Sequence, residues 1–160
     1  AEQVRPDEPF GGGRGTSMFT WNGSMRLDRA KGLVTLLEGV KLTHQRAGDN
    51  VVSELDCEKL TAVVREQPGE SDARSFSGEL VSAEAEGGVW IRANGRELIA
   101  DRASYDAINR VLTARASPGN YVEVFDPGAV TPRTARELRW DMVKDRIDIV
   151  NPGSGTGPRR

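Results

Sequence analysis

LIADRASYD-AINR-VLTA, residues 98–114, is the stretch that decides the fold of this chain. Apolar and polar residues alternate on both sides of the turn-like AINR segment, and this period of two predicts two β-strands joined as a hairpin. Asp106 stands at the corner, where an aspartate side chain can accept hydrogen bonds from backbone N–H groups two residues further on. The stretch therefore predicts a strand, a tight corner and a second strand running back beside the first.

The same pattern occurs three times along the chain. LDRAKGLVTL (27–36) and WDMVKDRIDI (140–149) match YDAINRVLTA (105–114) position by position: a large apolar residue, an Asp, four turn-like residues and a new alternating strand. A second signature precedes the corner, because ELDCEKLT (54–61) aligns without gaps with ELIADRAS (97–104), and ARELR (135–139) is a looser copy. In each copy two charged residues follow a small one and shift the alternation by one, as a β-bulge does.

A third signature is a strand that bends at glycine. LVTLLEGVKL (33–42) alternates on both sides of Glu38-Gly39, and LVSAEAEGGVWI (80–91) repeats this form with an insertion. The copies stand at unequal distances along the chain, whereas the coils of a parallel β-helix have a nearly constant length. An antiparallel meander tolerates loops of different length, so we expect an all-β, antiparallel fold rich in strand and poor in helix.

Composition limits the domain count and the classes of partner. The chain has 160 residues and a formal net charge of -2, which suits one domain and gives no basic surface for nucleic acid. No apolar run approaches the ~20 residues of a membrane-spanning helix. Glycine and proline gather at both ends, so we expect an N-terminal linker over 1–17, one β-domain over 18–151 and a C-terminal tail over 152–160.

No group of residues resembles a catalytic or metal site. His44 is the only histidine and Cys57 the only cysteine, so neither has the partners that a metal site or a nucleophile–base pair needs. Glu84 and Glu86 imitate a carboxylate pair, but the alternation places both on the outer face of their strand. GGGRG (11–15) has neither a preceding strand nor a following Lys-Ser/Thr, so it is not a phosphate loop. We expect a protein that is not an enzyme and holds no metal or cofactor.

These motifs resemble the OstA/LptA-like family of lipopolysaccharide-transport proteins. Residues 98–106 match the family's "l-x-A-D-x-a-x-Y-D" strand, and residues 33–42, with Gly39-Val40, carry its "v-l-x-l-x-G-x-V-x-V" strand with the glycine one position later. The resemblance extends over about 19–150. It departs from the family pattern after Leu112, where SPGN intervenes and the glycine is displaced, and at the insertion REQPGESDARSFSGE (65–79).

The resemblance implies a fold and a function. The family's fold is a β-jellyroll, a folded-over pair of V-shaped sheets whose apolar inner face accepts acyl chains. It also implies a periplasmic or cell-envelope location, a non-enzymatic role in outer-membrane biogenesis, and lipopolysaccharide or a related glycolipid as the ligand. The domain edges, near 19–27 and 146–150, would join like domains by strand addition, since open sheet edges carry unpaired backbone groups.

The alternation also defines the residues that would line the interior. Many are alanines, and small inward side chains would leave room between the sheets. A filled core is the alternative for the same pattern, and it would make the chain a structural or adhesive β-repeat domain of a larger secreted protein. The basic residues of the last third, such as Arg102 and Arg139, belong either to a solvated face or to a mouth that contacts lipid phosphates. The expected acyl-binding residues are Val34, Leu36, Val40, Leu42, Leu55, Leu60, Val89, Ile91, Ala100, Ala103, Tyr105, Leu112, Ala114, Val122, Val124, Leu138, Trp140, Ile147 and Ile149.

Overall fold

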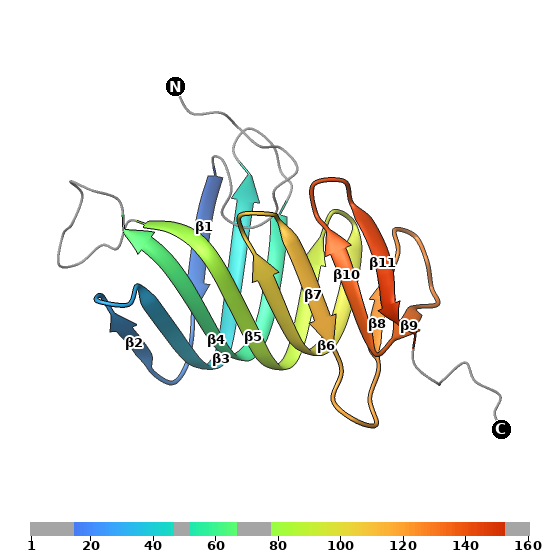
Figure 1. Cartoon of the computed structure of the whole chain (residues 1–160), viewed down its shortest axis with the longest axis horizontal. Coiled ribbons are helices and arrows are strands. Elements are labelled where there is room, and N and C mark those ends of the chain that lie inside the picture. Colours follow the sequence, from blue (N-terminus) through green and yellow to red (C-terminus); the bar gives the residue numbers. More distant parts are fainter. Residues whose placement is uncertain (1–14, 47–51, 67–77, 153–160) are drawn as a thin grey trace.

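The computed structural model describes residues 15–46, 52–66 and 78–152, and within these ranges it contains strands and no helix (Figure 1). Period-two patterning therefore decided the fold class, as the sequence predicted. The strands are β1 (Gly15–Thr20), β2 (Met25–Asp28), β3 (Leu33–Arg46), β4 (Val52–Glu66), β5 (Gly78–Ala93), β6 (Arg96–Asp106), β7 (Val111–Arg115), β8 (Val122–Phe125), β9 (Arg133–Ala135), β10 (Glu137–Asp141) and β11 (Arg146–Asn151).

All strands belong to one antiparallel sheet that is folded over on itself. Its main path runs β1-β3-β4-β5-β6-β7-β10-β11, and the long strands β3 to β6 cross from one half of the sheet to the other. We call the halves leaves. The first leaf joins β2, β7, β10 and β11 to the adjoining parts of β3–β6, and the second leaf joins β1, β8 and β9 to the remaining parts. The sheet does not close into a barrel, so this is the open jellyroll that the family resemblance implied.

The long strands bend where the sequence places bulges. The register of β3 against β4 shifts between Leu37 and Val40, around the pair Glu38 and Gly39, whose φ angles are 71° and 58°. In β5 the register shifts at Gly87-Gly88, with φ angles of 84° and 57°. A side chain is strained at such angles, and a Cβ on Gly87 would lie 2.8 Å from Cβ of Glu58. These bends fold one leaf over the other.

The three repeated corners have the predicted aspartate geometry. Asp106 Oδ1 accepts from the amides two and three residues further on, at 3.0 and 3.1 Å. Asp141 Oδ1 accepts from the same two positions at 3.1 and 3.0 Å, and Asp28 Oδ1 accepts at 3.2 Å from the amide three residues on. The fourth residue after each Asp has a positive φ: Gly32 at 64°, Arg110 at 58° and Asp145 at 52°.

The domain boundaries remain predictions. The strand β1 begins at Gly15, inside the segment expected to be a linker, and β11 ends at Asn151. The rest of the expected linker and tail, 1–14 and 153–160, lies outside the described residues, as does 67–77 of the insertion.

Candidate functional site

The first leaf presents two apolar rows to the interior. Strand alternation turns every second residue inward, and the register of neighbouring strands aligns these residues across the leaf. One row is Leu36, Leu60, Ala85, Ala103, Ala114, Leu138 and Ile149; the other is Val34, Ala62, Ala83, Tyr105, Leu112, Trp140 and Ile147.

The second leaf supplies the facing wall. Its row crosses six strands and consists of Phe19, Leu42, Leu55, Ile91, Leu98 and Val124.

These rows form one continuous apolar strip whose exposure rises at its ends. Ile91, Leu98 and Leu138 in the middle are fully buried, with 0% of their surface exposed. Met25 at the N-terminal end is 50% exposed, and Ile149 at the C-terminal end is 38% exposed. The strip is therefore buried in its centre and exposed at its two ends.

The structure brings together the residues that the sequence singled out. All but Ile149 belong to one buried apolar cluster or pack against it, with Val34, Leu42 and Ile147 only partly buried. Ile149 lies on the same inner row, facing Leu138 across the strands, and is exposed because β11 is the edge of the leaf. That these residues bind acyl chains stays a prediction.

Several inward-facing residues were not predicted from the sequence, among them the buried Ala93 and Met142 and three residues near the N-terminal edge. Phe19 faces Leu42, and Met25 and Leu27 face the first residues of β3. The alternation in MRLD (25–28), just before the first corner, is the signal that could have identified the latter two.

Small residues meet in the middle of the first leaf. Ala85, Ala103 and Ala114 are neighbours on three successive strands, and each is at most 3% exposed. Alanine leaves space opposite it for a larger group from the facing wall or from a ligand. The predicted abundance of inward alanine is therefore found in the centre of the strip.

Cys57 and His44 are both buried. Burial raises the pKa of the Cys57 thiol to about 11, and the thiol donates to the Lys59 carbonyl at 3.4 Å. A thiol with a raised pKa is a poor nucleophile. His44 is 3% exposed and faces Ser53 across β3 and β4. No group of three or more His, Cys, Asp or Glu suited to a metal occurs among the residues that the structure describes.

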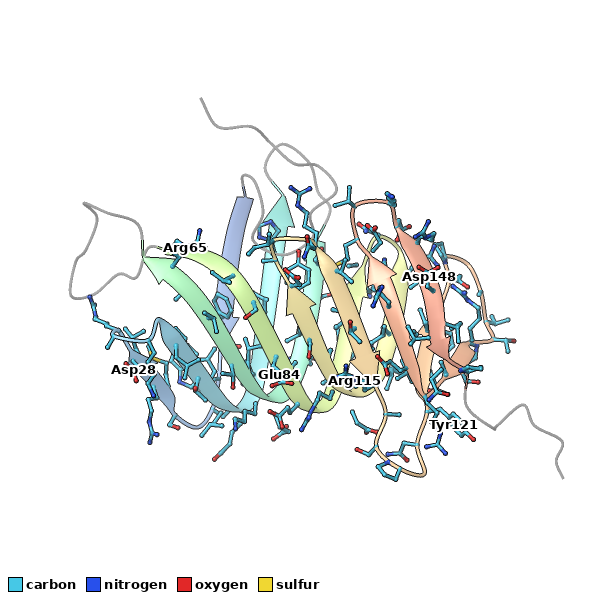
Figure 2. The ribbon with its side chains drawn as sticks, in the orientation of Figure 1. Asp28, Arg65, Glu84, Arg115, Tyr121 and Asp148 are labelled. Atoms are coloured by element: carbon cyan, nitrogen blue, oxygen red, sulfur yellow. The ribbon has the colours of Figure 1, made fainter. Side chains whose placement is uncertain are left out.

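A hollow of about 760 Å³ lies on the outer face of the first leaf, not between the leaves. Its lining includes Glu84, Ser104, Thr113 and Arg139, and Glu84 is labelled in Figure 2. Glu84 accepts weakly from the Ser104 hydroxyl, at 3.5 Å. The position agrees with the prediction that Glu84 is an outer-face carboxylate.

The basic residues of the last third are interleaved with carboxylates. Arg102 pairs with Glu86 at 3.3 Å, and Arg115 pairs with Glu137 at 3.5 Å. All four side chains are between 29 and 53% exposed. These contacts favour the solvated face over a mouth specialised for phosphate.

The fold and the apolar strip define an open antiparallel β-jellyroll of the LptA-like type. Among solved structures, the chain is similar to the crystal structure of LptH, the LptA-homologous periplasmic component of the lipopolysaccharide transport device of Pseudomonas aeruginosa. The TM-score is 0.61, the identity is 12%, and the match covers 90% of each chain. No family model and no curated protein matches the sequence. The structure contains, in its described ranges, no apolar helix of membrane-spanning length.

Proposed function

We propose that the chain is a periplasmic module of outer-membrane assembly that binds lipopolysaccharide or a related glycolipid and passes it along, with the acyl chains between its two leaves. It performs no chemical reaction in this role. The fold-level likeness to a periplasmic transport component supports the proposal, but at 12% identity the ligand has to be argued from the interior itself.

The observation that carries the proposal is the continuity of the apolar strip into both ends of the jellyroll. A closed β-sandwich buries its apolar residues and presents polar ones at its rims. Here Phe19, Met25 and Ile149 belong to the strip and are 46%, 50% and 38% exposed. Each acyl methylene transferred from water to such a strip contributes about 0.8 kcal/mol, so several of them bind without a specific polar contact.

The open ends also support stacking of like domains. The strands β1 and β11 are the two ends of the sheet path, and among the described strands each is paired on one side only, which leaves an edge of backbone N–H and C=O groups. Exposed apolar side chains stand on both strands, with Met18 59% and Val150 50% exposed. Strand addition from β11 of one copy to β1 of the next would align the two strips end to end.

A structural or adhesive β-domain is the second candidate, and the closed centre favours it. Leu98, Leu138 and Trp140 are 0% exposed, as in an ordinary filled core. In that case the exposed end residues would contact a protein partner rather than a lipid.

Binding of a polyene fatty acid, whose fluorescence rises in apolar surroundings, separates the two candidates. The parent should bind the probe, and Phe19→Gln and Met25→Gln should weaken binding several-fold, because both residues extend the inner strip. Ile99→Gln is the matched control: Ile99 is 39% exposed, comparable with Phe19, but alternation places it on the outer face. Equal loss in all three variants, or no binding by the parent, would contradict the proposal.

A further inference from the structure

A polar cluster joins the two leaves along the side opposite the bends. Arg96 Nε contacts Asp145 Oδ1 at 3.1 Å, and Arg96 Nη1 pairs with Asp126. Arg133 Nη2 also pairs with Asp126, at 2.8 Å. The Arg96 side chain is only 15% exposed, whereas Asp126 and Asp145 are 33% and 38% exposed.

The partners come from different leaves. Arg96 begins β6 in the second leaf, and alternation places it on the inner face with Leu98. Asp145 lies in the turn between β10 and β11, in the first leaf (Figure 1). By contrast, the ion pairs Lys41–Asp56, at 3.4 Å, and Arg92–Glu54 each join neighbouring strands of one leaf.

The turn between β10 and β11 also covers one side of the interior. Trp140 Nε1 donates to Asp145 Oδ1 at 3.0 Å, so Asp145 accepts from the buried indole as well as from Arg96. Met142, in the turn, is 0% exposed and its amide donates to the Arg110 carbonyl at 3.1 Å. Moving this turn outward would uncover Met142 and Trp140, and with them the C-terminal half of the strip.

We propose that Arg96, Asp126 and Asp145 form a clasp that controls lateral access to the interior. The inference rests on the proposed function. The long strands run through the bends and hold the leaves together there, so the leaves part most easily on the opposite side, where Arg96 and Asp145 meet. The two carboxylates are partly hydrated already and gain water on separation, which makes a polar contact there easier to open and reclose than an apolar one. An acyl chain then enters or leaves sideways, without threading through the ends.

The test measures how fast the polyene fatty acid leaves the full chain. Asp145→Asn removes the charge and keeps the shape, and Arg96→Lys keeps the charge but loses the two-sided contact. Both variants should release the probe several-fold faster than the parent in a stopped-flow exchange. Glu54→Gln is the matched control, because it breaks an ion pair within one leaf, and it should release the probe at the parental rate.

A ligand-free readout separates failure of the clasp from failure of the proposed function. Ala114→Cys in a Cys57→Ser background places one small thiol in the closed centre, where Ala114 is 0% exposed. Adding Asp145→Asn should raise its rate of maleimide labelling several-fold, while adding Glu54→Gln should not. Unchanged labelling, or faster labelling with unchanged probe release, overturns the clasp. If the parent binds no probe, the proposed function fails, and labelling still decides whether the cluster holds the leaves together.

Discussion

Ala114→Leu tests whether the centre of the strip is the place where acyl chains lie. Ala114 is 0% exposed, between Ala103 and Leu138 on the neighbouring strands. Leucine adds three carbon atoms, which would contribute about 2.4 kcal/mol to stability if a void received them, at about 0.8 kcal/mol each. In a close-packed interior they cost about 1–3 kcal/mol instead.

Because the centre of the strip is fully buried, we expect the added carbon atoms to cost stability. Ala114→Leu should lower the free energy of unfolding by about 1–3 kcal/mol, and it should weaken binding of the polyene fatty acid, because the new side chain takes the volume that an acyl segment needs once the leaves part. Urea denaturation and a fluorescence titration measure the two effects. Thr113→Leu is the control, since Thr113 precedes Ala114 but lies on the outer face; it should change the free energy by less than about 0.5 kcal/mol and leave binding intact.

Probe binding, rather than stability, separates the two candidate functions. Probe affinity unchanged by Ala114→Leu would refute the placement of acyl chains in this row. Lowered stability together with no binding in the parent would leave the filled structural domain as the function.

Three further predictions follow from edges and titrating groups. Val150→Lys, on the edge strand β11, should abolish any concentration-dependent self-association seen by light scattering; a parent that stays monomeric at high concentration contradicts edge pairing. The hydrogen bond from the Ser117 amide, followed by that from the Asn120 side chain, lowers the pKa of Asp101. The stability that Asp101 contributes to the fold is therefore present above pH 3.8, the ordinary pKa, and is lost as the pH falls further. Acid titration followed by circular dichroism should show a smaller loss of stability for Asp101→Asn than for the parent. An identical loss in both would contradict a contribution of Asp101 to stability. Because burial raises the pKa of Cys57 to about 11 from 9.0, stability should decline as the pH rises through this interval, and Cys57→Ser should abolish that decline in alkaline urea denaturation.

Local features of the fold could be predicted from the sequence because their causes are local. An aspartate that caps its own turn and a Glu-Gly pair with positive φ need only a few neighbouring residues, so the corners and bends were identified. The alternation likewise predicted which side chains meet inside, as the burial of Ile91 and Leu138 confirms.

Long-range features could not be predicted in this way. Arg96 and Asp145 are separated by 49 residues, and charged residues in alternating strands carry no signal of their distant partners. The closure of the centre was equally hidden, because alternation gives the direction of a side chain but not the distance between the leaves. The pairing of β6 with both β7 and β8 depends on the same global folding.

Native mass spectrometry of the freshly purified chain tests the central claim most directly, because it detects a lipid held in the interior without a probe. The account predicts additional peaks displaced by the mass of an acyl-bearing lipid, with their intensity reduced in Ala114→Leu and retained in Thr113→Leu. A spectrum that shows only the mass of the polypeptide, both for the protein as isolated and after incubation with lipopolysaccharide, would contradict it.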